Sequence, residues 1–403
     1  MKNLLVLFAS SLLFISCQSS SETKPLNLDD YTWKDIKAEG QAQEMTMMMW
    51  KGDPKINAYM QQYIKPKLLK KHNINLTIVD GQGNYIVQML MAELQAGANT
   101  SEIDLMWING ETFYQLRQID ALFGPWTSKL PNASNIDFEN PFIGKDFQQA
   151  IDGYEMPWGN VQMTLIYNQD KIQQPPQTRA ELLSFVKEHP GRFTWNNHFT
   201  GLTFMKALLM NIAGGAEVLK GEFNEDLYAK YSDELWIYLN QLKPYLWRQG
   251  EVFPENVAQM HQLFANGELL FTMSNNDAEV DNKVEEGLFQ KSSRAYVPEF
   301  GSIQNSHYLG ISKLSKKKLS AMLVVNELIS EENQLEKMKP SVWGDGTVLQ
   351  VSKLDSVFQK KFNSIAQRHY APPREDIQQK ALPELAPEYM IRLAEDFKKN
   401  LID

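Results

Sequence analysis

The sequence is poor in the residues that build most catalytic and metal sites. Its 403 residues contain one cysteine, so no internal disulfide can form, and its six histidines are scattered along the chain. It has no His-Glu-x-x-His motif, no phosphate-binding Gly-x-x-x-x-Gly-Lys-Ser/Thr loop and no Gly-x-Ser-x-Gly turn. Gly81-Gln82-Gly83 begins like a dinucleotide-binding fingerprint, but Ile86 stands where the third glycine belongs. We therefore expect no enzyme activity, no metal and no cofactor.

Basic residues are also in deficit. The chain has 40 Lys and Arg against 49 Asp and Glu, which gives a formal net charge of −9. Nucleic acid and anionic membrane surfaces are bound through basic patches, so neither is expected as the main partner. The 43% hydrophobic content is enough, over this length, for two domains with cores of their own.

Long apolar runs are absent except at the N-terminus. Lys2 precedes an apolar run that ends at Ser16, which is typical of a signal peptide and too short to span a membrane. Phe14-Ile15-Ser16-Cys17 resembles a bacterial lipobox, with Phe where Leu is commonest. We expect removal of residues 1–16, lipidation of Cys17 and a polar tether over 17–40. The alternative is a conventional signal peptide with an incidental cysteine.

From residue 44 the pattern alternates between strands and helices. Strands are expected at 45–50, 74–79 and 104–108, and helices at 56–71 and 84–97, followed by a short helix after Asn109. This order predicts an open parallel sheet, in which ligands bind outside the carboxyl ends of the strands. The loops at those ends are 50–53, 80–84 and 107–112.

The stretch Gly153–Ile172 joins a polar loop to an apolar, strand-like run. Pro175-Pro176 then breaks the chain before a helix over 179–188, for which Thr178 and Glu181 predict a capping box. Beyond this helix, strands are expected at 192–196, 269–273, 295–300 and 308–311, and helices at 202–213, 257–264, 313–329 and 388–400.

These motifs together resemble a known family. GYEMPWG…LIYNQDKIQQPPQTRAELLSF is similar to the first interlobe crossing of the type II solute-binding proteins of ABC importers, in their maltose-binding branch. MMMWKGD and EIDLMWINGETF resemble the first and third strands of that family, and the likeness extends over residues 41–400. The resemblance implies a two-lobed α/β fold, in which each lobe is a mainly parallel sheet flanked by helices with a cleft between the lobes.

The resemblance also implies the domain limits. Lobe 1 would comprise 41–160 and 309–369, and lobe 2 would comprise 161–308 and 370–403, with return crossings near 306–312 and 370–374. The implied function is capture of a small solute by hinge closure and its delivery to ABC permease subunits. The protein would be a monomer held by its lipid on the periplasmic or outer side of a bacterial membrane. The alternatives are a surface glycan-binding lipoprotein and an exported lipoprotein enzyme.

Candidate ligand contacts are the Trp, Asn and acidic residues at expected strand ends. Aromatic faces hold sugars and cations, and carboxylates hold cations. Asp53 is the strongest polar candidate, although it also suits the cap of the helix that follows. The acidic balance favours a cationic or polar neutral solute over an anion. The candidates are Trp50, Asp53, Trp107, Asn109, Glu111, Trp158, Asn160, Trp195, Asn196, Asn275, Asn276 and Trp343, with Glu299 and Asp345 weaker.

Overall fold

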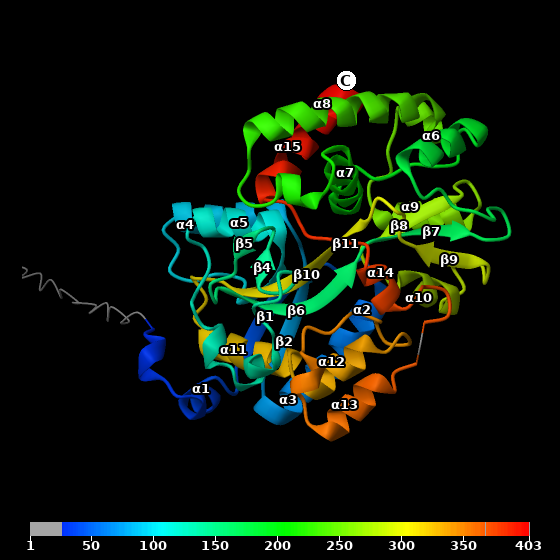
Figure 1. Cartoon of the computed structure of the whole chain (residues 1–403). Helices are drawn as coiled ribbons and strands as arrows, with labels where there is room; N and C mark the ends of the chain where they lie inside the picture. The colour runs from blue at the N-terminus through cyan, green and yellow to red at the C-terminus, as the bar shows by residue number, and fades with distance from the viewer. Residues whose placement is uncertain (1–25, 367, 403) are drawn as a thin grey trace, which may run out of the picture.

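Two separate sheets organise the computed structural model, which describes residues 26–366 and 368–402 (Figure 1). We call the elements packed on the larger sheet the first lobe and those packed on the smaller sheet the second lobe. The larger sheet has the order β11 (Ala381–Leu382), β10 (Ser302–Ile311), β3 (Leu105–Ile108), β1 (Glu44–Met49), β2 (Asn75–Asp80), with β6 (Glu155–Gln162) also paired to β10. The smaller has the order β8 (Phe271–Ser274), β7 (Thr164–Asn168), β9 (Ser293–Tyr296). Cys17 and the expected signal peptide lie outside the described residues.

Strand β1 shows how the sequence builds the first sheet. It pairs in parallel with both β2 and β3, as predicted. Met45, Met47 and Met49 enter the core on one side of the sheet, while Met48 enters the core on the other side. Successive side chains of a strand point to opposite faces, so a strand buried on both faces is apolar throughout.

Helices cover both faces of this sheet. Around Met48 lie α4 (Asn84–Gln95) and α5 (Gly110–Gln118). The other core takes side chains from α2 (Pro54–Ala58), α3 (Lys65–His72), α11 (Lys318–Leu328), α12 (Glu331–Met338) and α13 (Ser356–Asn363). A π-helical turn, Tyr59–Ile64, joins α2 to α3, so the helix predicted over 56–71 is continuous.

The tether predicted over 17–40 is wrong for its last part. Residues 33–39 form α1 (Trp33–Glu39), which begins with a capping box between Thr32 and Asp35 and packs against α11. The side chain of Ile36 is fully buried. A Cβ at Gly40 would stand 2.9 Å from the Leu319 carbonyl oxygen, so a glycine allows this close approach. The polar composition of residues 17–40 gave no indication that a short helix within them packs on the first lobe.

The predicted crossing between the lobes is present. Strand β6 runs antiparallel to β10 in the first sheet, and β7 lies in the second sheet, with only Met163 between them. The helix α6 (Arg179–Glu188) has the predicted bounds, and its Thr178 hydroxyl accepts from the Glu181 N–H at 3.2 Å. The Glu181 carboxylate accepts from Gln177 N–H rather than from Thr178, so the capping box is displaced by one residue.

The second sheet differs from the prediction of a mainly parallel sheet in each lobe. Strand β7 is antiparallel to both β8 and β9. The reason is the path of the chain: β7 leads away from the first lobe, whereas β9 leads back into β10. Residues 192–196 are not a strand, and the Phe193 carbonyl instead accepts from Trp247 N–H at 2.9 Å.

The core of the second lobe is built mainly from helices. It contains side chains of α6, α7 (Phe199–Ile212), α8 (Glu225–Leu242), α9 (Val257–Ala265) and α15 (Pro387–Phe397). The prediction that the last helix packs on this lobe is confirmed, because Tyr389, Leu393 and Phe397 are buried in its core. Two shorter helices, α10 (Glu279–Glu285) and α14 (Arg374–Gln378), follow β8 and the last described crossing.

Candidate functional site

The loop after β1 carries Asp53 to the boundary between the lobes. Its Oδ1 accepts from the N–H groups of Lys55 at 2.8 Å and Ile56 at 3.0 Å, so it caps α2. Its Oδ2 accepts from the ammonium of Lys283, on α10 of the second lobe, at 2.8 Å. Asp53 thus caps a helix, which is the alternative that the sequence offered, and it also pairs with a side chain of the second lobe. Its contact with a solute stays a prediction.

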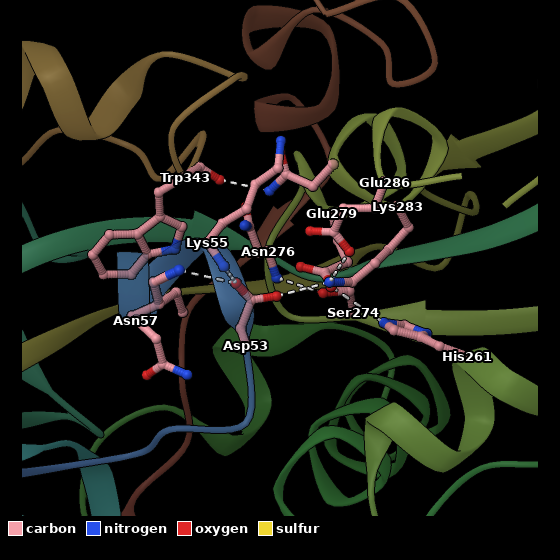
Figure 2. Close-up of polar contacts among 12 residues, drawn as sticks. Asp53, Lys55, Asn57, His261, Ser274, Asn276, Glu279, Lys283, Glu286 and Trp343 are labelled. Atoms are coloured by element: carbon pink, nitrogen blue, oxygen red, sulfur yellow. Dashed lines mark hydrogen bonds and ion pairs between the residues drawn. The ribbon is translucent and has the colours of Figure 1, made fainter. Parts of the chain in front are cut away.

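Lys283 is the centre of a charged network (Figure 2). Besides Asp53, its ammonium lies 3.0 Å from a carboxylate oxygen of Glu286 and 3.4 Å from one of Glu279. Burial lowers the pKa of Lys283, but these carboxylates outweigh burial and raise it. Burial raises the pKa of Glu279, but the nearby imidazole of His261 and ammonium of Lys283 lower it overall. Both shifts favour the charged forms of Glu279 and Lys283, so an ion pair lies at the centre of this acidic cluster.

Lys55 makes a second connection between the lobes. Its ammonium donates to Glu285 at 2.8 Å and to the side-chain oxygen of Asn282 at 3.1 Å, both on α10. The amide of Asn282 donates in turn to the Trp343 carbonyl of the first lobe at 2.7 Å. Asp53 and Lys283 connect the same two surfaces. The lobes are therefore in contact at the ends of their strands.

An open hollow of about 420 Å³ adjoins this network. Both lobes line it, through α10 on one side and through α12, α13 and the loop between them on the other. Its lining residues are Asp281, Glu285, Leu335, Lys339, Pro340, Ser341, Lys361, Ser364, Ile365, Ala366 and His369.

Four of the candidate tryptophans differ in how deeply they are buried and in what they pack against. Trp107, Trp158 and Trp343 form one cluster with His307, with ring centroids between 4.8 and 5.7 Å apart. Trp158 and Trp343 are buried in the first-lobe core, whereas Trp107 is half-buried at the end of β3. Trp195 is fully buried in the second-lobe core against Phe204 and Phe253. Burial of this kind assigns Trp158, Trp195 and Trp343 structural roles in this conformation.

Two candidate asparagines hold backbone in place. Asn160 donates to the carbonyls of Phe142 and Asn305 at 3.1 and 3.2 Å. Asn196 accepts from the N–H groups of His198 at 3.0 Å and Gly201 at 3.2 Å, which shapes the turn before α7.

The remaining candidates lie at strand or helix ends and are half-buried: Trp50, Trp107, Asn109, Glu111, Asn275 and Asn276. Asn275 donates to the Thr200 hydroxyl at 3.2 Å, and Asn276 accepts from Ala278 N–H at 3.0 Å. Figure 2 shows Ser274 and Asn276 in the same view as the Lys283 network. These residues and Asp53 come from both lobes, so they are the set best placed to meet a solute.

Sequence reasoning missed Lys55, His261, Glu279, Lys283 and Glu285. The missed signal was the acidic helix after the expected 269–273 strand, in which Lys283 follows Glu279 by one helical turn. Within residues 26–366 and 368–402, no three His, Cys, Asp or Glu side chains are grouped to hold a metal ion. No helix in that same part of the chain combines the length and apolar character needed to cross a membrane.

Comparisons with known proteins show what the chain as a whole is similar to. Residues 58–364 match the family described as bacterial extracellular solute-binding protein. The chain is 35% identical to Protein YnjB of Escherichia coli (strain K12) over 326 residues, which are 80% of this chain and 84% of that protein.

Solved structures share the fold. The spermidine/putrescine ABC transporter substrate-binding protein PotD from Streptococcus pneumoniae superposes with a TM-score of 0.61 at 15% identity, covering 89% of this chain and 99% of PotD. The periplasmic binding protein AfuA from Actinobacillus pleuropneumoniae, with fructose-6-phosphate bound, gives a TM-score of 0.62 at 14% identity, covering 89% and 98%. The architecture is therefore the two-lobed fold of periplasmic binding proteins.

Proposed function

Because the chain belongs to the bacterial extracellular solute-binding protein family, we propose that it is the lipid-anchored solute-binding component of an ABC importer. The family consists of transport proteins, which excludes the expected alternative of an exported enzyme. Surface glycan-binding lipoproteins are built mainly of helical repeats, whereas two β-sheets organise this fold, which speaks against that alternative. Solute-binding proteins of ABC transporters deliver their ligand to permease subunits.

The observation that supports this function best is the meeting of two strand-end loops. Asp53 follows β1 of the first lobe, and Lys283 follows β8 of the second lobe, and the two side chains bond at 2.8 Å. We propose that a solute binds between these loops and that the lobes close about the crossings β6–β7 and β10. Such hinge closure is driven by contacts that the solute makes with both lobes at once.

The proposed lobe limits follow the crossings. Lobe 1 comprises 41–160 and 309–369, and the docked helix α1 extends it to residue 33. Lobe 2 comprises 161–308 and 370–403. Strands β6 and β10 run side by side across this boundary, with Asn305 opposite Val161, so β10 begins in lobe 2 and ends in lobe 1. A pair of adjacent strands bends more readily than a packed core, so it suits a hinge.

We propose a small polar or cationic solute. The network at the lobe boundary holds four carboxylates, those of Asp53, Glu279, Glu285 and Glu286, against the two ammonium groups of Lys55 and Lys283. This excess of negative charge disfavours an anion. The similar proteins PotD and AfuA are described with spermidine/putrescine and with fructose-6-phosphate, so the fold alone decides nothing about solute charge.

The anchor and the partners are proposed from the sequence. Lipidation of Cys17 would hold the protein, as a monomer, on the periplasmic or outer side of the membrane, near its permease. Two or three acyl chains anchor firmly, since each buried methylene contributes about 0.8 kcal/mol.

A thermal-shift screen tests the proposal. Polyamines, amino acids, sugars and thiamine-like cations form the panel, and sugar phosphates and dicarboxylates serve as anionic controls. A solute at 100 times its Kd adds about 2.7 kcal/mol to the free energy of unfolding, which raises the melting temperature measurably. Stabilisation by an anionic control alone would contradict the proposed solute class.

A further inference from the structure

A strained hairpin of the first lobe reaches into the second lobe. Strands β4 (Lys145–Asp146) and β5 (Gln149–Ala150) are joined by Phe147 and Gln148, whose φ angles are +47° and +64°. Turns with two left-handed residues favour Asn and Gly. Phe and Gln in this conformation cost free energy, and such strain persists only where surrounding contacts hold it.

Those contacts come from the second lobe. Phe147 is buried in the second-lobe core, with its ring centroid 6.4 Å from that of Phe199 and 4.0 Å from the ammonium of Lys206 on α7. The amide of Gln148 donates to the Glu384 carbonyl at 2.7 Å. The hairpin tip is therefore an interlobe contact that exists only while the lobes are together.

Acidic side chains surround this contact in excess. From the second lobe, Lys206 forms a buried ion pair with Glu384. From the first lobe come three acids on different elements: Glu111 on α5, Asp146 on β4 and Glu155 on β6. Glu155 is fully buried, and neither of its carboxyl oxygens has a hydrogen-bond partner in the described part of the chain.

A second cation, Arg117, lies near these acids, and its charge partly opposes the effect of burial on the pKa of Glu155. The guanidinium of Arg117 lies 3.6 Å from the ring centroid of Tyr154, and no ion pair joins it to a carboxylate among the described residues. The Tyr308 hydroxyl is committed to the carbonyls of Ile143 and Lys145. Helix α15 also packs against α5, and burial together with Glu388 of α15 raises the pKa of Tyr114 on α5. The cluster thus has four carboxyl groups, Glu111, Asp146, Glu155 and Glu384, near two cations, the ammonium of Lys206 and the guanidinium of Arg117.

A buried carboxylate without a partner is too costly to keep ionised, so it takes up a proton. Burial raises the pKa of Glu111 to about 7. It outweighs a backbone hydrogen bond and the ammonium of Lys206, which both lower the pKa, and Glu384 adds to the rise. Burial also raises the pKa values of Asp146 and Glu155 well above their usual range. For Asp146 it does so despite the hydrogen bond that this carboxylate accepts from Gly110 N–H. Opening the lobes would withdraw α7 and Glu384 and return water to Glu111 and Asp146.

We propose that the Phe147 hairpin couples lobe closure to proton uptake, so that acid favours the closed protein and alkali favours the open one. The inference rests on the hinge closure proposed above. The carboxyl pKa is higher in the closed state, so the added stability of that state is complete at low pH and is lost as pH rises through about 7. For one carboxyl whose pKa rises from its usual 4.5 to about 7, the closed-to-open ratio increases roughly fivefold from pH 7 to pH 6.

The test needs no solute. Leu69 on α3 and Ile237 on α8 are exposed, at 50% and 62%, and lie on opposite lobes (Figure 1). In a chain that carries Cys17→Ser, Leu69→Cys and Ile237→Cys, the two introduced cysteines are the only ones. A fluorophore pair can be attached to them, and the energy transfer can be followed from pH 8 to pH 5.5. We expect energy transfer to rise as pH falls. Between pH 7 and pH 6, Glu111→Gln should make the increase in the closed-to-open ratio about five times smaller than in the parent chain. A label distance that does not change with pH in the parent chain would overturn the proposal.

The matched control is Glu188→Gln, which removes an exposed carboxylate of α6 far from the hairpin in sequence and should keep the parental response. Glu111→Gln also separates the hairpin from other ionisable groups at the lobe boundary. If that variant retains the full pH response, the proposal is wrong. If circular dichroism shows that Glu111→Gln does not fold, Asp146→Asn is used in its place. The direction in which energy transfer changes with pH in the parent chain then still supports or contradicts the proposal. A solute screen that fails leaves this test unaffected.

Discussion

Lys283 donates to Asp53 across the lobe boundary at 2.8 Å, and both side chains are more than nine-tenths buried. The two residues are 230 positions apart, so the pair joins the first helix after β1 to the helix after β8. A buried ion pair contributes little net stability, but losing one partner leaves an uncompensated buried charge. The pair is therefore better understood as a device that orients the two lobes.

The two functions of Asp53 can be separated by two substitutions. Asn caps helices as well as Asp does, so Asp53→Asn should keep the α2 cap and lose only the pairing with Lys283. Asp53→Ala should lose both and cost about 1 kcal/mol more in free energy of unfolding, measured by urea titration. Asp53→Asn should also weaken a cationic solute by about tenfold, the effect of one charge-assisted hydrogen bond. Equal stability of the two variants would contradict the capping role.

Trp195 and Trp50 should respond oppositely to truncation. Trp195 is fully buried among aromatic rings, so Trp195→Ala should cost about 3–5 kcal/mol in stability. Trp50 is half-buried at the end of β1, so Trp50→Ala should change the melting temperature little and reduce solute affinity instead. Thermal melts with and without the solute found in the screen measure both effects. A Trp195→Ala protein of parental stability would show that burial in this structure is misassigned.

These two tryptophans show how far sequence reasoning extends. Each stands at or near the end of an expected strand and directly before a polar residue, and a core tryptophan and a ligand-binding one have the same local pattern. The alternation of the methionines in β1 and the crossing at Met163 were predictable because periodicity and turn residues are local signals. Only the tertiary packing distinguishes Trp195 from Trp50.

Strand direction and long-range pairs could not be read in the same way. A buried strand has the same composition whether its neighbours run parallel or antiparallel, so the second sheet was expected to be parallel. Asp53 was a candidate because it ends a strand. Its partner Lys283 lies on α10, which was not among the expected helices, and nothing local indicates contact over 230 positions.

Asp277 should make stability depend on acid. It follows β8 and pairs with Arg368 and, at 2.8 Å, with Arg374 near the last crossing. Burial raises the pKa of Asp277, but the two guanidinium groups outweigh it and lower the pKa overall. A carboxyl with a lowered folded-state pKa contributes stability above its unfolded pKa, and this contribution is lost as pH falls through the folded value. Urea unfolding from pH 6 to pH 3 should therefore show a loss of stability that is smaller in Asp277→Asn. The exposed control Glu188→Gln should keep the parental loss.

The anchor prediction concerns Cys17. Cys17→Ser should release the protein in a form that detergent phase partitioning places in the aqueous phase, or leave an uncleaved precursor. The physical reason is that the acyl chains have no other attachment point in a chain with a single cysteine. Equal partitioning of variant and parent into the detergent phase would contradict lipidation.

Solute binding should make the particle smaller. In the structure the lobes already touch through Asp53–Lys283 and Lys55–Glu285, so the solute-free protein should exchange between this arrangement and an open one. Removing one ammonium with Lys283→Met leaves four carboxylates near each other and should shift the solute-free protein toward the open form. Small-angle scattering should then give a larger radius of gyration for Lys283→Met than for the parent. Saturating solute should reduce the radius of both. Lys220→Met, at an exposed ion pair with Glu217 in the second lobe, is the control and should match the parent. A radius that stays constant with solute in the parent, at a concentration that raises its melting temperature, would show that binding does not close a hinge.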